Sequence, residues 1–166
     1  MKKILVIATV LLTIAAMVVP LSVSAISPIN EGSTSISGTV PVVIEVDAPV
    51  SAALGNLSVS APVSLTVPVT VTVKSTDPKW TLGASADNAG LMYTAGKALS
   101  LASALKIQGG DLGSWTTLSG TDVTVKTATA SVGQTDIANV NFQQSIGYGD
   151  TAANYTINVT FTGTPN

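Results

Sequence analysis

The feature that most constrains the fold of this chain is a strict alternation of apolar and polar residues from position 63 to position 74. Every second position holds a branched apolar residue: Val63, Leu65, Val67, Val69, Val71 and Val73. Because successive side chains of a strand point to opposite faces, this pattern predicts a strand with one buried and one wet face. Pro68 lies on the polar face and has no N–H for a ladder, so it predicts a sheet edge, a bulge or a break into two strands.

Other segments repeat this period more weakly. Apolar residues alternate with polar ones over residues 155–162, which predicts a C-terminal strand. Residues 98–107 fit either one or two helical turns or a strand. Shorter strands are expected over residues 79–85, 122–128 and 140–146. Many short strands separated by Gly, Asn and Asp turns predict an all-β fold, an antiparallel β-sandwich or jelly roll, as a single domain after a cleaved signal peptide.

The N-terminus has the anatomy of a secretory signal peptide. Lys2 and Lys3 precede an apolar run over residues 4–19, and small residues up to Ala25 form a cleavage site. The apolar run is shorter than the roughly 20 residues of a membrane span, and no basic cluster follows it. We expect removal of residues 1–25 rather than a retained anchor. The mature chain is then expected to lack a transmembrane span and to be secreted or at the cell surface.

A segment of different character opens the expected mature chain. Residues 26–38 are rich in Ser, Gly and Thr and predict a flexible leader, which residues 36–46 follow as a strand. The in-phase apolar side chains of this strand are Val40, Val42, Ile44 and Val46. A strand behind a flexible leader can pair with its own sheet or with that of a neighbouring copy. We therefore interpret residues 26–47 as a leader with an exchangeable strand, and residues 48–166 as the sandwich domain.

Composition excludes several classes of function. The chain has no cysteine and no histidine, so catalysis with a His or Cys partner and zinc, haem or iron–sulfur sites lack their residues. Beyond residue 25, five lysines face nine acidic residues and there is no arginine, a net charge of −4 that disfavours nucleic acid and anionic membranes. Turn aspartates such as Asp87 and Asp111 suit calcium, but Asp is also favoured in turns for its own hydrogen bonds. We expect a non-enzymatic protein without cofactor or metal.

Few polar or aromatic residues remain as candidates for binding or modification. Trp80 is in phase with Leu82 and is expected in the core, whereas Trp115, between small polar residues, is the candidate for a ligand-facing aromatic. Three Asn-x-Ser/Thr sequences predict candidate glycosylation sites at Asn56, Asn154 and Asn158. An ordinary polar strand face is the alternative interpretation of these asparagines.

Two resemblances extend this interpretation. Lys79-Trp80-Thr81-Leu82 after a Val/Thr strand, with the Tyr/Thr-rich end over residues 154–165, resembles the WxL-type cell-surface domain over roughly residues 57–166. That resemblance implies a cell-wall or surface protein with a β-sandwich fold that is attached non-covalently. The signal peptide, the Thr/Val-rich strands and the extended N-terminal strand also resemble secreted fibre subunits of the camelysin-like type and archaeal bundling pilins. In such fibres the strand fills a groove of the next subunit.

Together these patterns predict a secreted, non-catalytic structural protein of the cell surface or of an extracellular filament. It is expected to assemble with itself or to attach non-covalently to the envelope. The alternative is a carbohydrate- or cell-wall-binding module. The expected partners are therefore copies of the same chain or a cell-envelope polymer.

Overall fold

A computed structural model describes residues 35–65, 67–128 and 135–166 of the chain. The compact part is the unit Val40–Asn166. Of the unit before it, residues 35–39 are described, and they are exposed and have no regular secondary structure. The predicted signal peptide (residues 1–25) and most of the predicted leader lie outside the described residues.

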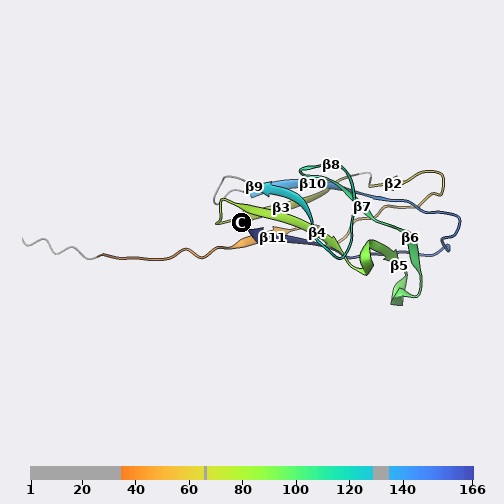
Figure 1. The fold of residues 1–166 in the computed structure, drawn as a ribbon, viewed down its shortest axis with the longest axis horizontal. Helices are drawn as coiled ribbons and strands as arrows, with labels where there is room; N and C mark the ends of the chain where they lie inside the picture. The colour runs from red at the N-terminus through yellow and green to blue at the C-terminus, as the bar shows by residue number, and fades with distance from the viewer. Residues whose placement is uncertain (1–34, 66, 129–134) are drawn as a thin grey trace, which may run out of the picture. The chain divides into compact units, whose positions relative to one another are not determined.

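Strands make up nearly all of the regular structure in the described part of the chain (Figure 1). The only helical elements there are two short 3-10 helices, η1 (Asn88–Gly90) and η2 (Ala95–Lys97). The strands are β1 (Ile44–Asp47), β2 (Val63–Ser64), β3 (Val69–Ser75), β4 (Trp80–Ala86), β5 (Leu91–Tyr93), β6 (Ser100–Ala104), β7 (Lys106–Gly109), β8 (Leu112–Thr117), β9 (Val123–Ala128), β10 (Thr135–Gln144) and β11 (Val159–Pro165).

The strands form two main antiparallel sheets. The larger sheet has the order β1-β3-β10-β7-β8, and β2 pairs with β10 beyond the start of β3. The smaller sheet has the order β11-β4-β9, and β5 and β6 form a separate pair. β1 and β11 are edge strands that pack against each other across the two sheets. The architecture is therefore the all-β antiparallel sandwich that the sequence predicts.

The core lies between the two sheets and follows directly from the sequence alternation. In β3 and β4 every second side chain is buried, which places the valines of β3 opposite the Trp, Leu and Ala side chains of β4. The alternating polar residues stay on the outer faces, as expected for sheets with one solvated side. The most completely buried side chains include Val71, Val73, Leu82, Ile107, Val125 and Val140.

A tight turn joins β7 to β8 and depends on two glycines. Gly109 and Gly110 have φ angles of +116° and +62°, which L side chains rarely adopt. A Cβ atom at Gly109 would also collide with the main-chain carbonyl oxygen of Asn139 in β10. The Gly-Gly pair therefore lets this hairpin lie flush against its neighbouring strand.

Pro68 breaks the long alternating run, one of the three outcomes that the sequence predicts. Both resulting strands, β2 and β3, pair with β10, so the run keeps its partner across the break. The prediction that Val67 points inward with its neighbours is wrong, because its side chain is 75% exposed. The interruption at Pro68 shifts the phase locally, while Leu65 and Val69 on either side remain buried.

Several strand boundaries differ from those expected. The C-terminal strand begins at Val159 rather than at Tyr155, and the preceding residues make one isolated bridge between Thr156 and Tyr93. The N-terminal strand covers Ile44–Asp47 rather than residues 36–46. Residues 98–107 take the strand alternative, as β6 and the start of β7.

Candidate functional site

Hydrogen bonds from one threonine hold the start of the N-terminal strand against the larger sheet. Thr76, directly after β3, donates its main-chain N–H to the carbonyl oxygen of Val43 (3.0 Å) and accepts the N–H of Val43 at its hydroxyl (2.8 Å). The same hydroxyl donates to the carbonyl oxygen of Pro41 (2.9 Å). These bonds fix residues 41–43 beside β3. From Ile44 onward the β1–β3 ladder takes over, with Ile44 opposite Ser75 and Asp47 opposite Thr72.

The four residues predicted for strand exchange divide into two pairs. Ile44 and Val46 are half-buried and pack against the core, and both contact the position of Gly163 in β11. Val40 and Val42 are 78% and 58% exposed. The apolar face that these four side chains share is therefore partly buried at Ile44 and Val46 and exposed to solvent at Val40 and Val42. Strand exchange itself stays a prediction.

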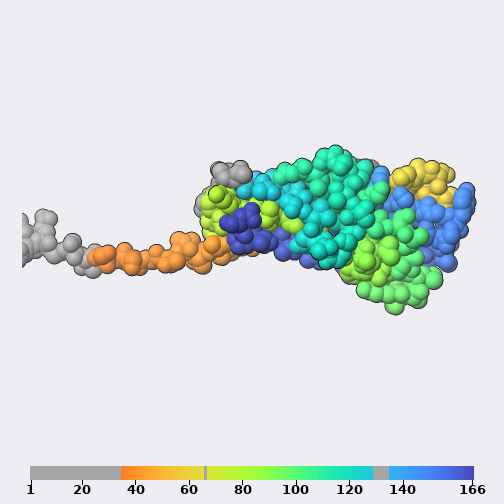
Figure 2. Space-filling model, in the orientation of Figure 1, coloured from red at the N-terminus to blue at the C-terminus, as the bar shows by residue number. Residues whose placement is uncertain are grey.

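A large groove lies between the two sheets and two irregular segments, and both apolar and polar residues line it. It encloses about 1160 Å³. Leu65, Val69 and Phe142 of the larger sheet line one side, and Val159 and Phe161 of β11 line the other. Two irregular segments, residues 49–59 and residues 146–158, complete the lining together with side chains of β5 and β6. Figure 2 shows the β5–β6 region (green) beside the segment after β10 (blue), at the end of the sandwich where β2 (yellow) lies.

Residues 49–59, which we call the flap, form one wall of this groove. Its anchors are Leu54 and Leu57, which are half-buried and pack against the core cluster. Across residues 48–62, no main-chain to main-chain hydrogen bond joins the segment to any other described residue. The flap is therefore held by a few apolar contacts and not by a ladder, which gives it low local stability.

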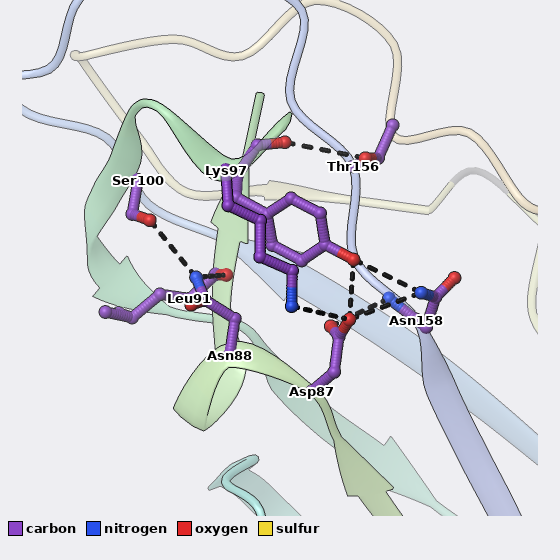
Figure 3. A network of polar contacts seen from close by, with 8 residues as sticks. Asp87, Asn88, Leu91, Lys97, Ser100, Thr156 and Asn158 are labelled. Carbon is purple, nitrogen blue, oxygen red and sulfur yellow. Dashed lines mark hydrogen bonds and ion pairs between the residues drawn. The ribbon is translucent and has the colours of Figure 1, made fainter. Parts of the chain in front are cut away.

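A polar network fixes the other wall of the groove (Figure 3). Asp87, after β4, accepts hydrogen bonds from the Tyr93 hydroxyl (2.5 Å) and from the main-chain and side-chain nitrogens of Asn158 (3.1 and 3.2 Å). Lys97 lies 3.6 Å from the Asp87 carboxylate and 4.6 Å above the Tyr93 ring. The network ties the entry of β11 to β4, β5 and η2, so the wall that carries Val159 is rigidly placed.

The network also perturbs its own titratable groups. Burial raises the pKa of Asp87, but the hydrogen bonds from Tyr93 and Asn158 and the charge of Lys97 outweigh it, so the pKa is lowered overall. The hydrogen bond to Asp87 raises the pKa of Tyr93, as do burial and the carboxylate charge. Both shifts favour an ionised aspartate beside a neutral tyrosine, the pair that holds this wall in place.

A second carboxylate organises the loop after β10. The carboxylate of Asp150 accepts hydrogen bonds from the main-chain N–H groups of Gly147 (2.8 Å) and Ala102 (2.9 Å). These bonds lower the pKa of Asp150. Asp150 is also the only charged residue that lines the groove among the described residues, and its charge is already engaged within the chain.

The two tryptophans lie in different surroundings. Trp80 is 2% exposed in β4, which confirms its expected place in the core. Trp115 is half-buried in β8, an edge strand of the larger sheet, and does not line the groove. Its predicted role as a ligand-facing aromatic stays a prediction. Tyr148, in the loop that lines the groove, is the most exposed aromatic side chain of the described residues.

The three candidate glycosylation sites are all exposed, and all line the groove. Asn56 lies in the flap and Asn154 in the irregular segment before β11. The amide nitrogen of Asn158 instead donates to Asp87 and to the Tyr93 hydroxyl. A glycan at Asn158 would take one of the two amide hydrogens that make these bonds. The structure shows no such engagement for the side chains of Asn56 and Asn154 among the described residues. Glycosylation stays a prediction at each position.

Sequence reasoning missed the groove, the flap and the Asp87 network. Asp87 fits the turn preference that the sequence suggests, yet its carboxylate reaches across the fold to Tyr93 and Asn158. The interruption at Pro49 after the N-terminal strand was the one available indication of the flap. Within the described residues, no helix is long and apolar enough for a membrane span, and no group of three or more acidic side chains gathers at a metal-binding distance.

Comparisons with known proteins identify no family for this chain. No family profile and no curated protein matches it. Among solved structures, it is similar to a chain from a structure of a chaperone-usher pilus that addresses how the pilus rod uncoils. The two share 16% sequence identity and a TM-score of 0.43, over 86% of this chain and all of the other. This likeness is too distant to support an inference about function.

Proposed function

We propose that this chain is a non-catalytic structural protein of the cell surface or of an extracellular filament, which assembles with copies of itself through its N-terminal segment. The observation that carries the proposal is an apolar face that runs out of the core into solvent. Ile44 and Val46 pack inside the sandwich, while Val42, Val40 and Ile36 continue the same phase with exposures of 58%, 78% and 93%.

Such a face is unusual in a protein that works alone. A single exposed valine is ordinary, but several apolar side chains in phase on an extended segment are a typical docking element for a sheet. Residues 33–44 carry no charged side chain that would keep the segment in solvent. Burial of these side chains against a second copy would remove their apolar surface from water and stabilise an assembly.

Export is part of the proposal and rests on the predicted signal peptide. N-terminal sequencing of the protein from the medium or the cell surface should begin at Ile26. Retention of the apolar run over residues 4–19 would contradict cleavage. A pull-down on purified cell wall then separates self-assembly from attachment to a wall polymer, and an unbound protein throughout would remove the wall-binding alternative.

Self-assembly is tested with the chain from Ile26 and a double variant, Val40→Ser with Val42→Ser. Light scattering after size exclusion and negative-stain microscopy should show multimers or filaments for the parent and a strong reduction for the variant. Val67→Ser is the matched control, because Val67 is similarly exposed but lies outside the segment. A parent that stays monomeric at high concentration, or an equal loss in the control, would contradict the proposal.

A further inference from the structure

We propose that the groove behind the flap receives the N-terminal segment, residues 36–43, of a second copy, and that the flap must leave to admit it. This inference rests on the proposed self-assembly and names the surface that receives the segment. The groove is larger than the roughly 300–1,000 Å³ typical of small-molecule sites, and residues of both sheets and of two irregular segments line it.

The chemistry of the groove matches that of the segment. The strands contribute apolar side chains to its lining, Leu65, Val69, Phe142, Val159 and Phe161, while the irregular segments add uncharged polar residues. Its one charged lining residue, Asp150, already accepts two main-chain N–H groups. A charged occupant would therefore find no unengaged charged partner among the described lining residues. Residues 36–43 are uncharged and place Ile36, Val40 and Val42 on one face.

The groove also borders an unpaired strand edge. On its β10 side, β3 is paired over residues 69–74, but β1 covers its other side only over residues 72–75. Residues 69–71 therefore offer main-chain groups without a partner strand on the β1 side among the described residues. An incoming strand in line with β1 would pair with this edge and insert its apolar face between the sheets, the combination that strand addition requires.

The segment cannot reach this edge within its own chain without reversing direction. β1 is antiparallel to β3, with Ile44 opposite Ser75, whereas Val69 at the other end of β3 borders the groove. Six residues of strand separate these two ends, about 20 Å. Going backward from Ile44, the chain leads away from its own groove, so the matching groove is that of another copy.

The flap is the element that must move. It covers the groove through Leu54 and Leu57 and makes no main-chain ladder, so a strand that offers both apolar contacts and a ladder would displace it. The closed flap then lowers the population of chains that can accept a partner. An isolated chain is protected against premature assembly, and assembly depends on concentration.

Directed crosslinking tests the location, because the chain has no cysteine of its own. A Val40→Cys copy is mixed with a Val159→Cys copy under oxidising conditions. The expected product is a disulfide-linked pair of the two copies. Val67→Cys in place of Val159→Cys is the control and should link only at background level, because Val67 is exposed but does not line the groove.

The flap is tested with Leu54→Ser and Leu57→Ser combined in one chain. Weaker anchoring should let assembly begin at about a tenfold lower concentration, since a larger fraction of chains is open. Far-UV circular dichroism confirms that the variant is folded. Should the variant unfold, a fluorescent peptide of residues 35–44 added to the parent chain is the second measurement, and it should bind and slow assembly.

The outcomes separate the two proposals. Multimers without the Val40–Val159 link, and without inhibition by the peptide, would overturn the groove as acceptor while leaving self-assembly intact. A folded flap variant that assembles only at higher concentration would overturn displacement of the flap. Absence of multimers under all conditions would overturn both proposals.

Discussion

A methyl group added at Gly163 would collide with the N-terminal strand. An ideal Cβ at this position in β11 would lie 2.5 Å from Cγ2 of Ile44 and 3.0 Å from Cγ2 of Val46. Ordinary contacts between such atoms are about 3.5–4.0 Å. Ile44 is branched at Cβ and stiff about χ1, so its methyl group cannot simply rotate away. The Gly163→Ala variant must therefore push β1 and β11 apart.

The expected cost follows from this geometry. Overpacking of a well-packed contact costs about 1–3 kcal/mol. Replacing Gly by Ala also restricts the unfolded chain, which returns about 0.4–1 kcal/mol. The net expectation is a loss of about 1–2 kcal/mol in the free energy of unfolding, or a fall of several degrees in Tm.

A double-mutant cycle isolates the contact between the two strands. Ile44→Ala alone should cost about 1–2 kcal/mol, less than the 2–5 kcal/mol of a fully buried isoleucine, because Ile44 is half-buried. In the double variant the new methyl group of residue 163 occupies the space that Ile44 vacates. The double variant should therefore be about as stable as Ile44→Ala, a coupling of about 1–2 kcal/mol.

Urea unfolding at low protein concentration, followed by tryptophan fluorescence, is the assay. Trp80 is buried and lies opposite Pro165 in the β4–β11 ladder, so it reports on this end of the sandwich. Gly113→Ala is the control, because no atom lies within 4 Å of a Cβ there, and it should be near neutral. A neutral Gly163→Ala, or additive effects in the cycle, would mean that β1 does not pack on β11 in solution.

Three further predictions concern the network, the hairpin and the exposed edge. Asp87→Asn should lower the free energy of unfolding above about pH 4, where the native carboxylate is ionised. The difference in stability between the variant and the parent should shrink as the pH falls through the lowered pKa of Asp87. Urea unfolding at pH 7 and pH 3 checks this, and an equal difference at both pH values would refute it. Gly109→Ala should lower the free energy of unfolding by about 3 kcal/mol or more, because it combines a positive φ with a clash against the carbonyl oxygen of Asn139. Thermal unfolding measures this loss, and a Tm equal to that of the parent would contradict the prediction. Trp115→Ala should leave multimers unchanged by light scattering, whereas a loss of cell-wall binding in the pull-down would favour the carbohydrate-binding alternative.

Much of the sandwich could be predicted because period-2 alternation reports directly on burial. Trp80, Leu82 and Ala84 are inward as expected, and the strand over residues 122–128 differs from β9 by one residue. The prediction from alternation that Val67 is buried is wrong, because Pro68 changes the local backbone path and the Val67 side chain is exposed. Alternation shows which face is buried but not where a proline resets the phase.

The candidate site was harder to predict, because it depends on contacts between distant segments. Tyr155 and Ile157 have the correct phase for a strand, yet they line the groove outside β11. They are half-buried because they pack against the core cluster, and the one strand-like contact near them is the isolated bridge of Thr156 with Tyr93. The bonds of Asp87 to Tyr93 and Asn158 span up to 71 residues of sequence, and no local pattern encodes such a distance.

The short β1–β3 ladder would also carry mechanical load in the proposed assembly. Tension would enter each copy through the N-terminal segment at Ile44 and leave through the groove near Val69, at opposite ends of β3. The pull then runs along the strands, while their hydrogen bonds lie across them. All the bonds of the ladder would be strained together in shear and would not open one after another. Four residue pairs could in this way resist a force that would easily peel the same strand away from one end.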